Sequence, residues 1–400
     1  MCWERFQRRG LSRLKLVGCG TRTNRERKFM FQRVKQINML ERLEVRNYKS
    51  LRDVKVRFEQ FNVLVGLNAS GKSNIIDCLS LVSESLQVFG NISQILKRRG
   101  GFKHVVFQGE EEFDVRVAFS VGKNKCEYYM KAAEEMVEER WLKINGREFI
   151  KEQRYTGKYL REDYSEVAFS GVWRSLTVGH PKCAKEISEC LEYLSKWHFY
   201  SFSTPEIRRT LPAKKSFALK RDGSNLAQVL LSLRTERPKI FAEIEEMLKL
   251  AIPEVEELLT PLTEEGETFV AVREKGFEHP FDYYQLSDGT LRLLAHITAL
   301  NLDAELVCFE EPENFVHPYL LRLLVEVLKK SGKQVILSTH SPYFLDFVEP
   351  EDLIIVEKKR GETKVRRIEN EEEKNRVRKL LEDGIPLGEV YYSGALSDEE

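Results

Sequence analysis

The chain has 400 residues, of which 42% are hydrophobic and 32% are Asp, Glu, Lys or Arg. This length can hold one large domain or two of ordinary size, and the balance of residues is that of a globular protein with a highly charged surface. The formal net charge of +1 excludes a uniformly basic or acidic chain. However, residues 1–38 carry eleven Lys or Arg against two acids, so the remainder is net acidic.

Membrane and disulfide-based classes find no support in the sequence. No uninterrupted apolar run approaches the ~20 residues of a membrane-spanning helix, and the N-terminus lacks the apolar centre of a secretory signal. The seven cysteines form no CxxC pair and no spacing typical of metal ligands. We interpret them as reduced thiols of a cytoplasmic protein without a membrane partner, rather than as disulfides or a zinc site.

Residues 1–38 show no hydrophobic periodicity. We expect a disordered extension there, or residues upstream of the true start. A basic arm that binds nucleic acid is the alternative.

The remaining chain divides into four segments. An α/β pattern opens residues 39–110 and returns in residues 285–400. Between them, residues 111–205 hold short strands rich in Val, Phe, Tyr and Trp, which predict an antiparallel lobe, and residues 206–284 are mainly helical. Besides a strand that begins at Met39, the expected strands are 54–58, 61–65, 305–309, 334–338 and 352–356. The expected helices are 72–86, 186–197, 225–250 with a break near Pro238, 290–301 and 318–330.

The stretch FNVLVGLNASGKSN has the spacing G-x-x-x-x-G-K-[ST] between an apolar strand and a helix. Glycines let successive backbone N–H groups surround a phosphate, and the helix adds the positive end of its dipole. We expect Lys72 to reach the β- and γ-phosphates of a nucleoside triphosphate and the Ser73 hydroxyl to bind Mg²⁺. The expected nucleotide contacts are Gly66, Asn68, Ala69, Ser70, Gly71, Lys72, Ser73 and Asn74.

The stretch VCFEEPENFVHP places two acids at the end of an apolar strand. A strand end that enters solvent would explain them, but the phosphate loop favours a catalytic site. We expect Glu310 to lie on the metal side and Glu311 to act as the general base.

Two further stretches carry polar groups beside regular elements. In YQLSDGTLRLLAHI, Ser287 and Gly289 precede a helix, where a hydroxyl and free N–H groups can meet an anion; an ordinary helix cap is the alternative. In QVILSTHSPYFLD, His340 follows a strand and could donate to a γ-phosphate, although a lone histidine is usually structural.

In this order, GLNASGKSN, LSDGT, FEEPENFVHP and STHSP resemble the motifs of the ABC class of ATPases. More specifically, they are similar to the RecF-like, SMC-related heads, which include the overcoming-lysogenization-defect (OLD) ATPases and stand-alone AAA-domain ATPases. RNYKSLRDV and RDGSNLAQVL also look like that group. The resemblance covers residues 39–394 and is weak in the middle. It implies an α/β P-loop head with a mixed central sheet flanked by helices, an antiparallel β lobe and a small helical insertion.

The resemblance also implies roles for individual residues. Ser287 and Gly289 would touch the γ-phosphate of ATP bound to a second protomer, so that two heads sandwich two nucleotides in a homodimer. Glu311 would be the catalytic base and His340 the γ-phosphate switch. The remaining implied residues are Lys49 and Ser50 near the nucleotide and Gln108 as a ligand of Mg²⁺.

Two positions depart from the wider class. Glu310 stands where most members have Asp, one methylene shorter, which alters the metal geometry. Asp288 and Thr290 replace the Gly and Gln of transporter signatures. An acid near a γ-phosphate is unfavourable unless it caps the helix instead.

The target of such a head is open. Ser287 follows Ser73 by 214 positions without apolar heptads, which favours a compact RecF-like head over one with a long coiled coil. Sixty residues follow His340 and contain no Asp-x-Asp, so we assign no nuclease activity to the chain. Two basic stretches could bind nucleic acid, with a solvated surface as the alternative. Their candidate residues are Arg98, Arg99, Arg208, Arg209, Lys214 and Lys215.

The sequence therefore predicts an ATP-dependent switch that dimerises on ATP and gates DNA binding or a partner such as a nuclease or toxin. DNA repair and antiphage defence are the settings that the resemblance implies. The alternatives are a regulator that binds ATP without hydrolysing it and the nucleotide-binding subunit of a membrane transporter.

Overall fold

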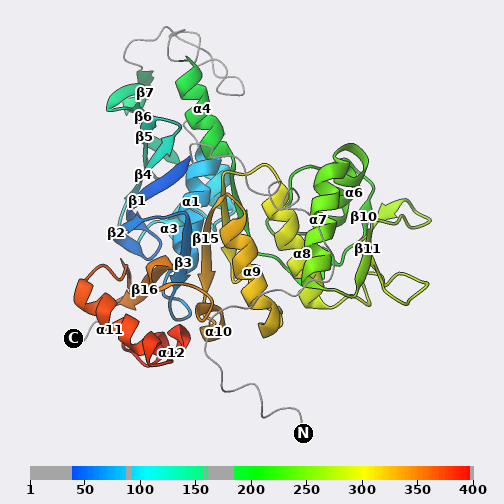
Figure 1. The fold of residues 1–400 in the computed structure, drawn as a ribbon. Coiled ribbons are helices and arrows are strands. Elements are labelled where there is room, and N and C mark those ends of the chain that lie inside the picture. Colours follow the sequence, from blue (N-terminus) through cyan, green and yellow to red (C-terminus); the bar gives the residue numbers. More distant parts are fainter. Residues whose placement is uncertain (1–37, 87–91, 156–157, 161–183, 397–400) are drawn as a thin grey trace. The chain divides into compact units, whose positions relative to one another are not determined.

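The computed structural model describes residues 38–86, 92–155, 158–160 and 184–396 (Figure 1). The extension expected over residues 1–38 lies outside the described residues, except for Asn38. No helix in these ranges combines the length and the apolar character that a membrane span requires.

A six-stranded sheet carries most of the predicted α/β pattern. Its strand order is β17-β16-β3-β15-β14-β9. Neighbouring strands from β16 to β9 run parallel, and only β17 at the edge is antiparallel. The strands are β3 (Phe61–Val65), β9 (Trp197–Tyr200), β14 (Leu306–Glu310), β15 (Gln334–Thr339), β16 (Leu353–Lys359) and β17 (Glu362–Arg366).

A seven-stranded antiparallel sheet has the order β2-β1-β4-β5-β6-β7-β8. Because β1 pairs with β4 along most of its length, the boundary expected at residue 110 falls between two partners of one sheet. Lys49 and Ser50 form the tight turn of the first hairpin, and Lys49 takes a positive φ of 50°. The strands are β1 (Met39–Tyr48), β2 (Leu51–Arg57), β4 (Glu112–Val121), β5 (Asn124–Ala133), β6 (Met136–Ile144), β7 (Arg147–Tyr155) and β8 (Lys158–Leu160).

Most of the longer helices follow the predicted pattern. The expected break near Pro238 is confirmed, because Arg237 ends one helix and precedes the next. Trp197, expected at a helix end, instead begins β9, where WHFY pairs with β14. The long helices are α1 (Lys72–Ser85), α4 (Ala184–Ser195), α6 (Leu226–Glu236), α7 (Pro238–Ala251), α8 (Asp288–Asn301), α9 (Pro318–Lys330) and α11 (Glu371–Glu382).

Short elements connect these layers. Two two-stranded sheets lie in the helical segment, β10 with β12 and β11 with β13. These strands are β10 (Leu211–Pro212), β11 (Val255–Leu259), β12 (Glu267–Thr268) and β13 (Ala271–Glu274). The short helices are α2 (Ser93–Lys97), α3 (Phe102–Val105), α5 (Thr204–Ile207), α10 (Pro342–Leu345), the 3₁₀ turn η3 (Pro350–Asp352) and α12 (Leu387–Tyr392).

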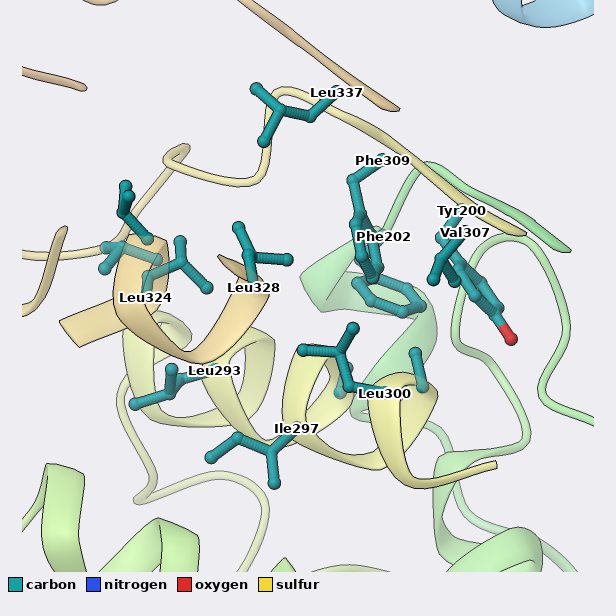
Figure 2. Close-up of a cluster of buried hydrophobic side chains, with 14 of the residues drawn as sticks. Tyr200, Phe202, Leu293, Ile297, Leu300, Val307, Phe309, Leu324, Leu328 and Leu337 are labelled. Atoms are coloured by element: carbon teal, nitrogen blue, oxygen red, sulfur yellow. The ribbon is translucent and has the colours of Figure 1, made fainter. Parts of the chain in front are cut away.

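The six-stranded sheet is buried on both faces, which explains its continuous apolar strands. In β14, Val307 and Phe309 point into one core, whereas Leu306 and Cys308 point into the other. The first core holds α6 to α9, and Figure 2 shows Phe309 of the sheet near side chains of α8 and α9. The second core joins the sheet to α1, α4 and the antiparallel sheet. Truncation of a buried ring such as Phe309 to Ala would cost about 3–5 kcal/mol.

Candidate nucleotide-binding site

The candidate residues follow the carboxyl ends of neighbouring parallel strands. The phosphate loop follows β3, the paired acids end β14, and His340 follows β15, which lies between the other two. Carboxyl ends of parallel strands meet at one edge of a sheet, where α/β proteins bind their ligands. The topology therefore brings the predicted phosphate loop, acids and histidine to one edge.

The phosphate loop has the backbone of a close-fitting anion cradle. Gly71 has a φ of 113°, which favours glycine. A Cβ on Gly71 would overlap the Thr363 side chain, and a Cβ on Gly66 would overlap the carbonyl oxygen of Val356. Ala69 also has a positive φ, and Asn68 beside it is exposed. The loop therefore lies against β16 and β17 and leaves its outer side to solvent.

The side chain of Lys72 contacts the backbone of the phosphate loop. Its Nζ donates to the carbonyl oxygens of Gly66 at 2.6 Å and Leu67 at 3.0 Å. Burial lowers the pKa of Lys72, and the nearby charges of Glu311 and Glu313 oppose that shift. The ammonium group thus lies within the electrostatic reach of both acids, as a shared phosphate site requires.

A chain of hydrogen bonds fixes the base of the loop. Asn74 Nδ2 lies 2.7 Å from Ser50 Oγ, Ser50 Oγ lies 2.7 Å from Thr363 Oγ1, and Thr363 donates to the carbonyl oxygen of Ser70 at 2.8 Å. Because the Thr363 hydroxyl donates its hydrogen to the Ser70 carbonyl oxygen, the Ser50 hydroxyl must donate to Thr363 and accept from Asn74. Ser50 and Asn74 therefore position the loop through Thr363, a buried residue that the sequence did not single out.

Lys49 is turned toward α1 and its charge is paired. Its Nζ lies 2.6 Å from Asp77 Oδ2, and Arg99 Nε lies 2.9 Å from Asp77 Oδ1. Burial alone would raise the pKa of Asp77, but Arg99, Lys49 and a hydrogen bond from Tyr48 bring it below its ordinary value. The structure thus gives Lys49 a place in an ion-pair network beside the loop.

Glu311 is held in a single orientation. Its Oε2 accepts from Asn314 Nδ2 at 2.7 Å, and its Oε1 lies 3.0 Å from His340 Nδ1. Its backbone has a φ of 46°, and its N–H donates to the carbonyl oxygen of Ser338. Positive φ is uncommon for a residue with a side chain and is found at functional sites. Both predicted groups, Glu311 and His340, are therefore brought into direct contact.

Glu310, the expected metal-side acid, pairs with Arg221. The distance from Arg221 Nη2 to Glu310 Oε1 is 2.5 Å. The arginine lies 89 positions away in the sequence, where it is the first residue of the stretch RDGSN.

Glu313 is a third acid of this segment and is buried. Its Oε1 accepts a 2.5 Å hydrogen bond from the hydroxyl of Thr339, and its Oε2 has no partner among the described residues. Burial raises the pKa of Glu313, although the Thr339 hydrogen bond opposes that shift.

Ser287 begins α8 as its N-cap. Its Oγ accepts from the Thr290 N–H at 3.1 Å and lies 2.8 Å from the Thr290 hydroxyl. Gly289 has no room for a Cβ, because the carbonyl oxygen of Phe315 lies there. We call the turn that contains Ser287 and Gly289 the signature turn. It is in contact with the segment after Glu311 within one chain.

Asp288 does not cap α8, because the N-cap residue is Ser287. Instead its Oδ1 lies 2.6 Å from Arg208 Nη2. Arg208 also donates to the carbonyl oxygens of Leu286, at 2.6 Å, and Tyr283. The guanidinium thus neutralises Asp288 and fixes the turn before α8.

Two of the candidate nucleic-acid residues have partners within the fold. Arg208 is engaged with the signature turn, and Arg99 is buried, with its side chain 6% exposed and paired with Asp77 and Glu84. Adjacent basic residues can differ widely in exposure, as Arg98 at 75% and Arg99 at 6% do, which the density of charge in the sequence does not reveal. Arg98, Arg209, Lys214 and Lys215 are exposed.

Gln108, the other predicted ligand of Mg²⁺, follows α3. It is exposed in a turn after α3, and within the described ranges no hydrogen bond or ion pair joins its side chain to the phosphate loop or the acids. Its role as a metal ligand remains a prediction.

The donor set fits magnesium shared with a nucleotide. Mg²⁺ takes one or two carboxylates together with phosphate oxygens and water. Ser73 is exposed at the start of α1, and Glu310 supplies a carboxylate at the end of β14. No group of three or more His, Cys, Asp or Glu side chains in the described part of the chain could hold a metal by itself. Phosphate oxygens would complete the shell.

Taken together, the parallel sheet, the phosphate loop and the acids define an α/β P-loop ATPase domain. Residues 39–168 match the family described as "AAA ATPase domain". Residues 180–346 match the family described as "AAA domain, putative AbiEii toxin, Type IV TA system". The chain is therefore similar to AAA-domain ATPases over two separate parts, each less than half of its length.

A curated relative, "OLD nuclease" from Thermus scotoductus, is 42% identical over 73 residues. The match spans 17% of this chain and 14% of the relative, so most of that protein lies outside it.

Solved SMC heads share the fold. The SMC head bound to the C-winged helix domain of ScpA has a TM-score of 0.56 at 16% identity, and the match covers 84% of this chain and 99% of that one. The Smc head with an extended coiled coil from Pyrococcus furiosus gives 0.55 at 15%, over 87% and 99%. The Smc head from Pyrococcus yayanosii gives 0.50 at 13%, over 87% and 100%.

Proposed function

We propose that the chain binds and hydrolyses ATP with Mg²⁺, and that ATP closes two heads into a homodimer. The observation that supports hydrolysis best is the placement of Glu311. Its carboxylate is oriented by Asn314 and His340, and it lies within electrostatic reach of the phosphate-loop Lys72. A base, a γ-phosphate contact and a phosphate cation thus share one edge of the sheet.

The geometry supports a direct reaction course. Lys72 would hold the β- and γ-phosphates, and Ser73 and Glu310 would hold Mg²⁺. Mg²⁺, when bound with the nucleotide, neutralises phosphate charge. Glu311 Oε1 accepts the proton of a water whose oxygen bonds to the γ-phosphorus. The bond from the γ-phosphorus to the bridging oxygen breaks, and ADP leaves with that electron pair.

Exposed aromatic side chains support the dimer. Tyr284 precedes the signature turn, Phe315 and Tyr319 follow the paired acids, and Tyr343 follows His340. Their exposed fractions are 77%, 68%, 84% and 64%, respectively. Large apolar groups are exposed at interaction sites more often than elsewhere. The proposed partner of these residues is the signature-bearing face of a second copy, which brings Ser287 and Gly289 to the other nucleotide.

The closed dimer would act as a switch on DNA or on a partner effector in the cytoplasm, in DNA repair or antiphage defence. The relative named as a nuclease and the family described with a toxin system support a nuclease or toxin as the effector. The exposed residues Arg98, Arg209, Lys214 and Lys215 support contact with DNA phosphates. Replacement of these four by Glu should abolish salt-dependent DNA binding.

A regulator that binds ATP without hydrolysing it is the second candidate. The ion pair between Glu310 and Arg221 favours it, because the metal-side acid is already occupied by a cation.

Steady-state ATP turnover separates the two. In the hydrolysing case, Glu311→Gln reduces turnover by at least about 100-fold, as expected for loss of a general base, but retains ATP binding and traps the dimer. Lys72→Ala loses binding as well. Glu243→Gln, an exposed acid on α7, is the matched control and stays at wild-type turnover. Equal and near-zero turnover of wild type and Glu311→Gln would leave only the non-hydrolysing regulator.

A further inference from the structure

The ion pair between Arg221 and Glu310 joins the metal side of the site to a distant segment. The side chain of Glu310 is 17% exposed and that of Arg221 is 48% exposed. Glu310 lies at the carboxyl end of β14, where the proposed function requires a ligand of the metal. One carboxylate therefore faces two candidate cations, a guanidinium that is present and a metal that arrives with the nucleotide.

The backbone of Arg221 is fixed in place, whereas its side chain can move. Its carbonyl oxygen accepts from the Ser201 N–H at 2.8 Å, directly after β9, the parallel neighbour of β14. Two residues later, Gly223 has a φ of 79° and no room for a Cβ, because Ile207 and Phe202 pack against it. The half-exposed guanidinium can leave Glu310 by side-chain rotation alone, without any change of the turn.

The extra methylene of Glu310 extends its carboxylate toward Arg221. A glutamate side chain extends one methylene further than the aspartate of the wider class, and here it ends against Arg221. A pair of partly exposed charges is weak enough to be displaced. A divalent cation that is also held by phosphates can therefore compete with the guanidinium for the carboxylate.

We propose that Arg221 is a positioning residue that occupies Glu310 in the nucleotide-free head and so raises the Mg²⁺ concentration needed for nucleotide binding. The inference rests on the proposed function, in which Glu310 is the metal-side acid. Arg221 competes with Mg²⁺ for Glu310 and is displaced when the metal and nucleotide bind together. The head thus binds its nucleotide only where Mg²⁺ suffices to displace the arginine.

The test is a Mg²⁺ titration of the binding of a non-hydrolysable ATP analogue, followed by fluorescence or calorimetry, so hydrolysis is not needed. Arg221→Gln should lower the half-saturating Mg²⁺ concentration by about two- to fivefold, the range for a partly exposed ion pair. Arg221→Lys, which keeps a charge, should fall between. Arg378→Gln, which breaks the exposed pair with Glu351, is the matched control and stays at the wild-type value.

A double-mutant cycle assigns the effect to this pair. Glu310→Gln should raise the half-saturating Mg²⁺ concentration, and Arg221→Gln should have no further effect in that background. An unchanged or raised Mg²⁺ requirement in Arg221→Gln overturns the inference while leaving the proposed function standing. If wild type binds no nucleotide at any Mg²⁺ concentration, both the inference and the proposed function fall.

Discussion

Arg292, on the helix that follows the Ser287 turn, donates a 3.0 Å hydrogen bond to the backbone carbonyl of Glu311. Its other terminal nitrogen donates to the carbonyl of Phe202 at 2.7 Å, and its guanidinium lies 5.7 Å from the centre of the Phe315 ring. The residue is 4% exposed, and burial lowers the pKa of its guanidinium. A displacement of α8 would therefore move the peptide of Glu311, the proposed general base.

Arg292→Met should reduce kcat for ATP by about ten- to 100-fold while the dissociation constant of ATP stays within about threefold of wild type. The reason is that, in the proposed function, Lys72 and the phosphate loop bind the nucleotide, whereas the orientation of Glu311 governs proton transfer. Single-turnover hydrolysis and equilibrium binding measure the two quantities separately.

Arg292→Lys is the conservative variant and should recover part of kcat, since an ammonium can reach one of the two carbonyls. A wild-type kcat in a folded Arg292→Met protein would show that the hydrogen bond to Glu311 has no part in the reaction. Urea unfolding identifies the folded fraction in each case.

Arg208→Gln should weaken ATP-dependent dimerisation by about tenfold, which corresponds to ~1.4 kcal/mol. Without Arg208, the charge of Asp288 is no longer neutralised and would face the γ-phosphate of the second protomer. Sedimentation of the Glu311→Gln protein with ATP measures the dimer, and nucleotide binding to the monomer should not change.

The double variant Arg208→Gln/Asp288→Asn removes both charges and should restore most of the dimer. Arg209→Gln, whose partner Glu206 lies three residues away, is the control. If Asp288→Asn fails to restore dimerisation, Arg208 acts by fixing the turn and not by neutralising the acid.

The sequence predicted the elements and the site edge well, because both follow from local pattern. Apolar runs bounded by glycine and acids specify parallel strands, and parallel strands place their following residues together. The contacts that tune the site could not be predicted. Thr363 reaches Ser70 across 293 positions and Arg221 reaches Glu310 across 89, and no local period connects such pairs. Arg292 did leave a signal, as a charge within the apolar run LRLLAHI.

Arg99→Met should lower the free energy of unfolding by about 3 kcal/mol, because removal of one partner leaves buried charge uncompensated. Its guanidinium pairs with Asp77 at 2.9 Å and with Glu84 at 2.8 Å. Arg98→Met is the neighbouring control: its side chain is 75% exposed and lies 3.9 Å from Glu84, so we expect a change within about 0.5 kcal/mol. Chemical denaturation measures both, and equal effects would mean that Arg99 is as solvated as Arg98.

His296 lies fully buried one turn beyond Arg292. Its Nδ1 lies 2.7 Å from the carbonyl oxygen of Arg292, and its ring packs edge-on against Phe202. Because that carbonyl can only accept, Nδ1 carries a proton, and the neutral form of the ring is therefore the Nδ1–H tautomer. Burial, with the charge of Arg292, lowers the pKa of His296 to about 3.

This pKa makes stability fall as the solution is acidified. In the unfolded chain the imidazole titrates near pH 6.5. Between this pH and the folded-state pKa, the unfolded state binds a proton that the folded state does not bind. The contribution is fully present above pH 6.5 and is lost progressively toward pH 3. At pH 5 the loss amounts to about 2 kcal/mol, from 1.36 kcal/mol for each pH unit. His296→Asn keeps a donor near the same carbonyl without titrating. Between pH 7.5 and pH 5, the free energy of unfolding in urea should therefore fall by about 2 kcal/mol less in His296→Asn than in wild type. The pKa of His198 is also lowered by burial, but His198 is present in both proteins and cancels in the difference. Parallel pH profiles for the two proteins would mean that His296 takes up its proton in the folded state.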